Sequence, residues 1–220
     1  MLDKIISYNK EHSEYGTEEF AHYMYGLVRM TKPNLFLELG TGHGSTAFMV
    51  AQAMKENGKG KVITLDNGGQ HGGGYQQKIL NKIKEFELEN HIEFRFKEFN
   101  IDAIKDIQIV DIVFSDFNRH PMHINMLLSW IIKQIKNRTL LFIDGAATYY
   151  DSFNYLELMV AALSKNKIIK ALSDVYKDDE DLIKKSMLYN FVLDHYYKDI
   201  DKPNQDSFSL LKIERKDIIL

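Results

Sequence analysis

The chain has 220 residues, a length typical of one large domain or of two very small ones. It contains no cysteine, which excludes disulfides, iron–sulfur clusters, cysteine-based zinc sites and cysteine nucleophiles within this sequence. Its 28 basic and 31 acidic residues leave a net charge of −3, so the composition gives no reason to expect nucleic acid or an anionic membrane as a partner.

The first part of the chain predicts helices that alternate with short buried strands. Apolar residues recur at helical spacing over residues 17–30, which predicts an amphipathic helix that starts at Thr17 and belongs to a helical cover over residues 1–32. Short apolar runs that stop at a glycine or an aspartate predict buried strands. The predicted strands cover 35–39, 61–65 and 91–99, and the predicted helices cover 45–55 and 76–88.

The alternation continues with strands over 110–114 and 139–143 and helices over 122–135 and 153–163. Strands and helices in this order predict an α/β fold with a doubly wound, mostly parallel sheet, in a single domain whose core begins at residue 33. The last fifty residues depart from this rhythm. There the pattern predicts a sixth strand over 167–171, a helix over 179–197 and a last, antiparallel strand over 207–213.

Glycines are concentrated after the first predicted strand. Ten of the thirteen lie between Gly40 and Gly74, and the segment 38–45 reads ELGTGHGS. Glycine lets a chain reverse and lets its backbone approach a ligand with no β-carbon in between. Ligands of open parallel sheets bind at the carboxyl ends of the strands. This loop therefore predicts a ligand site, with a simple glycine-rich turn as the alternative.

Two cofactor patterns compete for this loop. The dinucleotide fingerprint G-x-G-x-x-G fits Gly40 and Gly42, but its third glycine falls on Ser45. The pattern acid-x-G-x-G-x-G is matched in full by Glu38 and by the glycines at 40, 42 and 44. A carboxylate here suits the cationic S-adenosylmethionine and repels a pyrophosphate. Asp66 ends the second strand, where an acid accepts hydrogen bonds from ribose hydroxyls, and this residue favours neither nucleoside ligand over the other.

The stretch from Ala21 to Asp66, which contains ELGTGHGST from Glu38 to Thr46, resembles motif I and its surroundings in the class I S-adenosylmethionine-dependent methyltransferases. It is most similar to the small-molecule O-methyltransferase branch of that superfamily, whose fold is Rossmann-like. The resemblance runs through the fifth strand, about two-thirds of the chain. It implies cofactor contacts from Glu38, Gly40, Thr41, Gly42, Gly44, Ser45, Asp66, Asn67, Asn100 and Asp116. Near adenine, after the third strand, Glu98 is the alternative to Asn100.

Some members of this family hold Mg²⁺ with an aspartate after the fourth strand and an Asp-Asn pair after the fifth. Asp116 and Asp144 match the two aspartates, but residue 145 is Gly, so the third ligand is missing. Magnesium can keep several waters, so two carboxylates are a workable hypothesis for a metal site. The alternative is that Asp116 orients the cofactor and Asp144 lines the substrate cleft.

Methyl transfer to a hydroxyl needs a base, and histidine suits that role at neutral pH. His120 follows the fourth strand, so we predict a catalytic set of His120, Asp116 and Asp144, with His123 nearby; solvated loop histidines are the alternative.

The loop 67–75 holds five glycines and predicts a lid with His71 and Tyr75 as contacts, or a flexible surface loop.

These patterns predict an S-adenosylmethionine-dependent methyltransferase that acts on a hydroxyl of a small molecule. Three alternatives remain: an NAD(P)-dependent oxidoreductase, a relative that binds S-adenosylmethionine without catalysis, and a metal-dependent hydroxylase of the same fold. Methylation of nitrogen is also open. No segment approaches 18 uninterrupted apolar residues, and the N-terminus has no signal-peptide core. We therefore expect a cytoplasmic protein without a membrane partner. A homodimer that forms through the N-terminal helices is one possible arrangement.

Overall fold

The computed structural model describes residues 1–12, 18–167, 180–197 and 207–216. The chain divides into two compact units. One unit comprises residues 1–107 and 111–116, and the other comprises residues 108–110 and 117–220. Each unit is described below by itself, and the expectation of a single domain over the whole chain stays a prediction.

The first unit combines a parallel sheet with helices. Its elements in chain order are α1 (Leu2–Glu11), α2 (Glu18–Thr31), β1 (Leu35–Leu39), α3 (Ser45–Asn57), β2 (Lys61–Asp66), α4 (Tyr75–Glu85), β3 (Ile92–Phe96), α5 (Ile101–Ile104) and β4 (Ile112–Ser115). β1 pairs in parallel with β2 and with β4, and β2 pairs in parallel with β3. In this register Leu37 lies opposite Ile63 on one side and Val113 on the other, so apolar side chains share the centre of the sheet.

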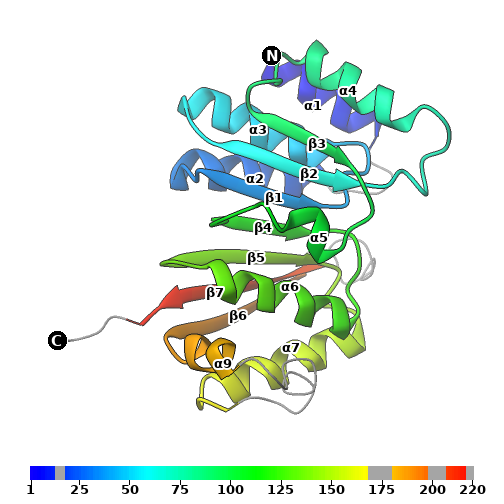
Figure 1. The fold of residues 1–220 in the computed structure, drawn as a ribbon. Coiled ribbons are helices and arrows are strands. Elements are labelled where there is room, and N and C mark those ends of the chain that lie inside the picture. Colours follow the sequence, from blue (N-terminus) through cyan, green and yellow to red (C-terminus); the bar gives the residue numbers. More distant parts are fainter. Residues whose placement is uncertain (13–17, 168–179, 198–206, 217–220) are drawn as a thin grey trace. The chain divides into compact units, whose positions relative to one another are not determined.

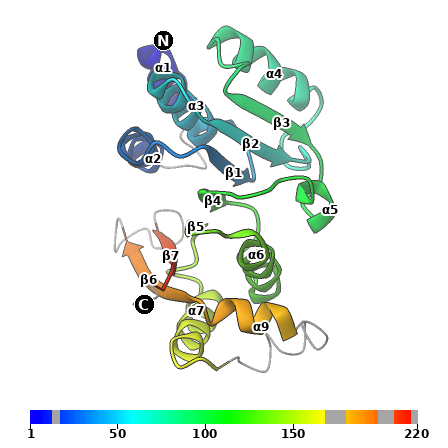
Figure 2. The ribbon, with the colours of Figure 1, turned by 60° about the vertical axis from the view of Figure 1, so that its left-hand side comes forward.

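The middle of helix α3 is buried on every side. All eight residues from Ala47 to Met54 are buried, so this part of the helix has no solvent-facing polar stripe. A helix that is apolar all round must be covered on more than one side. α1 and α2 pack against it and bury Ile5, Met24 and Val28 (Figure 2). The predicted N-terminal helical cover therefore packs on the helix that follows the glycine-rich loop; Thr17, its predicted start, lies outside the described residues.

The second unit ends in an antiparallel ribbon. Its elements are α6 (Pro121–Gln134), β5 (Arg138–Asp144), α7 (Tyr150–Leu163), α9 (Glu180–Ser186), β6 (Tyr189–Tyr197) and β7 (Ser207–Arg215). β7 pairs antiparallel with both β5 and β6, so the predicted antiparallel last strand is confirmed. Residues 168–171 of the predicted sixth strand lie outside the described part of the chain.

The helix predicted over residues 179–197 is wrong in its second half. α9 ends at Ser186, and β6 begins at Tyr189. Along the start of β6, Tyr189 and Phe191 are buried whereas Asn190 and Val192 are exposed, which is the period of two typical of a strand. Pairing of all nine residues of β6 with β7 outweighs the local helical pattern.

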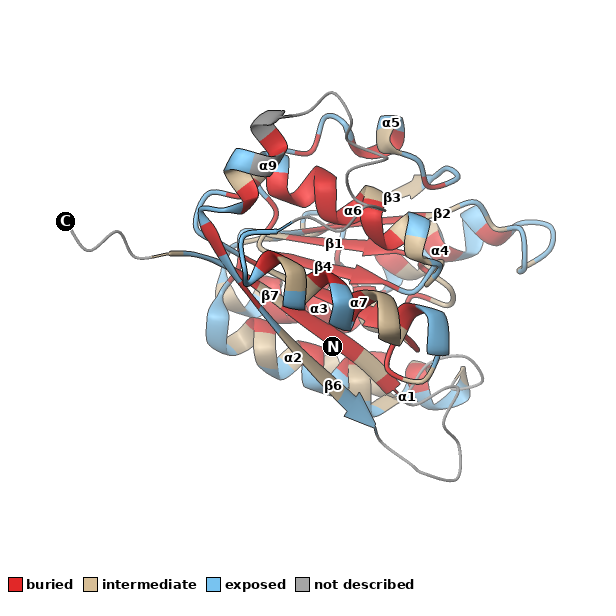
Figure 3. Cartoon of the chain, turned by 90° about the horizontal axis from the view of Figure 1, so that it is seen from below, coloured by how far each residue is buried: buried red, intermediate tan, exposed pale blue. Residues whose placement is uncertain are grey.

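The seven strands follow the order β3-β2-β1-β4-β5-β7-β6, with β7 antiparallel (Figure 1). This order confirms the predicted fold class, an α/β fold with a doubly wound, mostly parallel sheet. Strands β1 and β4 are buried along nearly their whole length, and one face of helix α6 is buried (Figure 3). Within the described ranges, the helices are too short or too polar to cross a membrane.

The turn between α3 and β2 provides a test of backbone constraint. Gly58 and Gly60 both have positive φ, at 69° and 97°. A Cβ on Gly60 would come within 2.7 Å of the carbonyl oxygen of Pro33, whereas a Cβ on Gly58 meets no atom within 4 Å. We expect Gly60→Ala to lower the free energy of unfolding by about 2–4 kcal/mol and Gly58→Ala by only about 1 kcal/mol. Urea unfolding of both variants measures this difference, and equal losses would contradict it.

Candidate functional site

The loop between β1 and α3 makes a tight reversal through residues 40–44. Gly40, Gly42 and Gly44 have φ values of 93°, 53° and 85°, all in the region that favours glycine. A Cβ on Gly44 would lie 2.5 Å from the ring of Phe48, so packing alone requires glycine there. A Cβ on Gly42 would meet no atom within 4 Å. The space beside Gly42 is therefore open and can receive a ligand.

The carboxylate of Asp66 holds this loop in place. One of its oxygens accepts hydrogen bonds from the backbone N–H groups of Thr41 and Gly42, both at 3.0 Å. The other oxygen accepts from the N–H of Gly68 at 2.7 Å. Its side chain is 13% exposed, and a carboxylate has lone pairs for about four donors. Asp66 therefore joins the loops after β1 and β2 and keeps capacity for one further donor.

Glu38 lies beneath the loop and not at its surface. Its side chain is 1% exposed, and it accepts a hydrogen bond from the hydroxyl of Thr64 at 2.5 Å. Thr64 in turn lies 2.6 Å from the hydroxyl of Thr41 in the loop. Burial raises the pKa of Glu38 from 4.5 to about 8, and the nearby charge of Asp66 adds to this shift. Glu38 is therefore protonated at neutral pH and supports the loop from inside.

The glycine-rich segment after β2 folds against the first loop. Tyr75 is buried, and its hydroxyl donates to the carbonyl oxygen of Gly42 at 2.8 Å. The ring of His71 stacks on Tyr75 with the centroids 4.5 Å apart. Burial raises the pKa of Tyr75, so its hydroxyl remains a donor at all ordinary pH values. Both residues predicted as contacts of a lid thus lie at the loop, and the Asn67 side chain accepts from Gly69 within its own turn.

Helix α1 is fastened to the same loop, a feature that the sequence analysis did not identify. The hydroxyl of Tyr8 donates to the carbonyl oxygen of His43 at 3.0 Å. The side-chain amide of Asn9, itself buried, donates to the carbonyl oxygen of Ser45 at 3.3 Å. No sequence pattern around Tyr8 and Asn9 predicts these hydrogen bonds, because both side chains bind backbone oxygens more than thirty residues away in the sequence.

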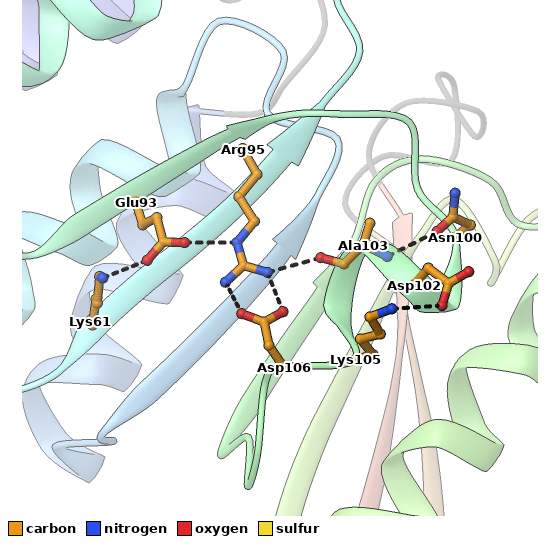
Figure 4. Close-up of polar contacts among 8 residues, drawn as sticks. All are labelled: Lys61, Glu93, Arg95, Asn100, Asp102, Ala103, Lys105 and Asp106. Atoms are coloured by element: carbon orange, nitrogen blue, oxygen red, sulfur yellow. Dashed lines mark hydrogen bonds and ion pairs between the residues drawn. The ribbon is translucent and has the colours of Figure 1, made fainter.

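Asn100 caps a short helix. Its side-chain oxygen accepts from the N–H of Ala103 at 2.9 Å, which starts α5 (Figure 4). Arg95 anchors the same segment through two bonds of 2.8 Å to Asp106 and one of 2.9 Å to the carbonyl oxygen of Ala103. Glu93 bridges Arg95 to the neighbouring strand, which completes a network from β2 to the end of α5 (Figure 4). The segment after β3 is therefore rigidly placed, with Asn100 at its start.

Asp116 directly follows β4 in the first unit. Its N–H donates to the carbonyl oxygen of Leu39 at 2.8 Å, and its side chain is exposed. The N–H of Gly40 likewise donates to the carbonyl oxygen of Leu65 at 2.9 Å. The carboxyl ends of β1, β2 and β4 therefore meet at one edge, so Asp116 and Asp66 share the edge that carries the glycine loop.

In the second unit, Asp144 is paired with a cation. The guanidinium of Arg119 donates to Asp144 at 3.1 Å and lies over the ring of Tyr149, 4.5 Å from its centroid. Gly145 makes room for this arrangement, because a Cβ there would come within 2.4 Å of Arg119. Within the described residues, no three or more His, Cys, Asp or Glu side chains gather as metal ligands. The magnesium site with Asp116 and Asp144 as its two protein ligands therefore stays a prediction.

The two predicted histidines differ in their surroundings. His120 is exposed and acts as the N-cap of α6, where its Nδ1 accepts from the N–H of Met122 at 3.3 Å. His123 lies on the first turns of α6 with its ring edge-on to Phe117. Burial lowers the pKa of His123, and the neighbouring His120 lowers it further. The Nδ1 of His123 is buried and has no hydrogen-bond partner among the described residues.

A serine, a histidine and a glutamate also form a chain in the second unit. His195 lies 2.8 Å from the hydroxyl of Ser209 and 3.2 Å from the carboxylate of Glu157. Ser209 has no exposed surface, so its hydroxyl cannot reach a substrate. This chain links β6, β7 and α7 and does not form a nucleophilic site.

Comparison of the sequence with known protein families gives one match. A family model described as "Methyltransferase domain" matches residues 37–170. This chain belongs to that methyltransferase family. The predicted resemblance to class I S-adenosylmethionine-dependent methyltransferases is thereby confirmed. No curated protein matches the methyltransferase.

Solved structures share the fold of the methyltransferase at low sequence identity. An O-methyltransferase from Bacillus cereus in complex with SAH has a TM-score of 0.62 at 14% identity, with 97% of this chain and 90% of that chain covered. The O-methyltransferase TomG from Streptomyces achromogenes, in complex with SAM, has a TM-score of 0.58 at 14% identity, with 98% and 89% covered. An rRNA methylase from Streptococcus thermophilus has a TM-score of 0.51 at 14% identity, with 88% and 95% covered.

The buried acid makes the stability of the methyltransferase depend on pH. Folded Glu38 keeps its proton up to about pH 8, whereas the unfolded chain loses it near pH 4.5, so stability falls as the pH rises between these values. A difference of one in pKa between the folded and the unfolded chain changes the free energy of unfolding by about 1.4 kcal/mol. We expect Glu38→Gln to unfold like the wild type at pH 5 and to be several degrees more stable at pH 8.5.

Thermal unfolding at the two pH values tests this expectation. Glu89→Gln is the control, because Glu89 is exposed and its replacement should change neither curve. A Glu38→Gln variant that is less stable than the wild type at pH 8.5 would contradict the raised pKa.

Proposed function

We propose that this methyltransferase transfers a methyl group from S-adenosylmethionine to a hydroxyl of a small molecule. The observation that carries the proposal is the open space beside Gly42, bounded by a fixed glycine loop and by Asp66. The bound forms of two fold relatives, one with SAM and one with SAH, support the choice of cofactor. When bound, S-adenosylmethionine supplies an electrophilic methyl group on a positively charged sulfur.

The first unit would hold the cofactor through groups that the loop already orders. Asp66 has capacity for a ribose hydroxyl in addition to its three backbone donors. Glu38 would lose its proton when a cation lies above the loop, because a nearby positive charge favours the carboxylate. Asp116 shares the same edge and would contact the cofactor beyond β4. Loop, ribose acceptor and counter-charge thus lie together within one unit.

The second unit offers the acid–base groups. Transfer of a methyl group to oxygen forms a C–O bond, leaves the electron pair of the broken C–S bond on sulfur, and requires the hydroxyl to lose its proton. His120 has Nε2 as its remaining ring nitrogen once Nδ1 caps α6. Burial and the neighbouring His120 lower the pKa of His123, which favours its neutral ring, the form that can take up a proton. We assign the proton to this histidine pair, with Arg119 and Tyr149 as contacts for the acceptor.

The acceptor is proposed to be a small molecule and not RNA. One fold relative is an rRNA methylase, so the fold alone does not choose between them. The net charge of −3 opposes binding to a phosphate backbone. The O-methyltransferases among the relatives favour a hydroxyl as the acceptor group.

Isothermal titration calorimetry of the purified chain with S-adenosylmethionine, S-adenosylhomocysteine, NAD and NADP tests the cofactor. We expect binding of the first two and none of the dinucleotides. Binding of NAD or NADP alone would overturn the proposal in favour of an oxidoreductase.

The reaction itself is tested by mass spectrometry, which measures the release of S-adenosylhomocysteine with a panel of phenols and sugars, with and without EDTA. Binding without turnover of any hydroxyl compound would favour the non-catalytic relative.

Gly42 provides the mutational test of cofactor binding. Gly42 and Gly72 both have positive φ, and a Cβ at either position meets no atom within 4 Å. Valine therefore strains the backbone similarly at both positions, but only at position 42 does it fill the proposed cofactor space. We expect Gly42→Val to weaken S-adenosylhomocysteine binding by about 100-fold or more, while Gly72→Val keeps the wild-type affinity.

Calorimetric titration of both variants measures the affinities, and circular dichroism confirms that both unfold cooperatively. Equal affinity in Gly42→Val and wild type would refute the placement of the cofactor beside this loop.

A further inference from the structure

A cavity of about 480 Å³ lies in the first unit, beside the glycine loop. Residues of α1, of the loop after β1, of the loop after β2 and of α4 line it; Figure 2 shows α1 and α4 at the upper end of the view, above β1 and β2. None of the lining residues is one of the predicted cofactor contacts. This volume suits a small organic molecule. The cavity is therefore a second candidate site, distinct from the space beside Gly42.

Five aromatic rings form a continuous row along the cavity. Tyr8 stacks on His12 with centroids 4.2 Å apart, and His71 stacks on Tyr75 at 4.5 Å. His43 lies between the two pairs, 5.1 Å from His12 and 5.4 Å from His71. The rings come from three separate segments of the chain. Faces of this kind favour a planar, aromatic ligand that can stack.

The charged residues that line the cavity favour an anion. Lys78 and Lys82 lie one turn apart on α4, and Glu11 is the only acid among the lining residues. The Lys82 ammonium lies 5.0 Å from the ring centroid of Tyr8 and also pairs with Glu85 at 2.8 Å. Lys78 makes no ion pair with any residue that the structure describes. An ammonium without a partner beside stacked rings is a suitable contact for a carboxylate.

A metal ion is a poor candidate for the same cavity. Its three histidines are spaced at stacking distances along the row, and the described residues hold no group of three or more His, Cys, Asp or Glu arranged as metal ligands. The ring nitrogen Nδ1 of His12 already contacts the carbonyl oxygen of Tyr8 at 2.9 Å. The rings therefore serve as walls and not as ligands.

We propose that this cavity binds a small aromatic carboxylate and that its occupancy alters cofactor binding. The link to the cofactor is direct, because two walls of the cavity hold the glycine loop. Tyr75 donates to the carbonyl oxygen of Gly42, and Tyr8 donates to that of His43. A ligand stacked on these rings restricts both hydroxyls, so it stabilises one arrangement of the loop.

Calorimetric titration of the full chain with benzoate, benzamide and cyclohexanecarboxylate tests the ligand class. Benzamide keeps the ring without the charge, and cyclohexanecarboxylate keeps the charge without the planar ring. We expect benzoate to bind about tenfold more tightly than either analogue. Absence of benzoate binding up to about 10 mM, or equal binding of all three, would overturn the proposal.

Two exposed lysines on α4 provide the variant and its matched control. Lys78 lines the cavity, whereas Lys84 lies on the same helix outside it. We expect Lys78→Gln to weaken benzoate binding by about fivefold or more and Lys84→Gln to leave it unchanged. An equal effect of both variants would show that benzoate responds only to the general charge of the helix, which contradicts a built site.

The link to the cofactor is measured by titrating S-adenosylhomocysteine with and without saturating benzoate. This measurement rests on the proposed function, and we expect the affinity to change by about threefold or more. Equal affinities would overturn the coupling. If S-adenosylhomocysteine does not bind at all, the proposed function fails while the benzoate titrations still decide the cavity.

Discussion

The carboxylate of Asp66 is the constraint on which the site depends. A loop with three glycines at positive φ cannot continue the hydrogen bonds of a helix or a strand, so its N–H groups need another acceptor. Asp66 supplies that acceptor for Thr41 and Gly42 and binds Gly68 as well. One side chain thus sets the shape of the loops after two neighbouring strands. Bonds from N–H groups to an ionised acceptor are among the stronger hydrogen bonds in proteins.

The second carboxyl group of the site, that of Glu38, has a raised pKa. Glu38 is buried one strand away, and both burial and the Asp66 charge raise its pKa. Two acids from adjacent strands therefore divide their roles: Asp66 holds the loop through its backbone hydrogen bonds, while buried Glu38, whose pKa is raised, supports the loop from below. An anionic cofactor would give Glu38 no reason to ionise.

The fold could be predicted from the sequence wherever a local pattern decided the structure. Buried strands followed by glycine or aspartate were predicted at the right places, because a parallel sheet buries both faces and needs a sharp exit. The prediction failed at β6, where pairing with β7 and not local spacing decides the conformation. The glycine loop and Asp66 were also found from local spacing. Tyr8 and Asn9 were missed, because their contacts with the loop depend on distant backbone atoms.

Gly145 has a structural role that the sequence pattern alone did not indicate. The family resemblance in the sequence analysis made position 145 the place of a missing third magnesium ligand. In the second unit its lack of a side chain has a positive consequence, since Arg119 occupies the space that a Cβ would take and pairs with Asp144. A fixed guanidinium can orient an anionic oxygen, which is one of the tasks of a metal ion. The glycine at position 145 therefore has a structural consequence of its own, because it leaves room for a guanidinium beside Asp144.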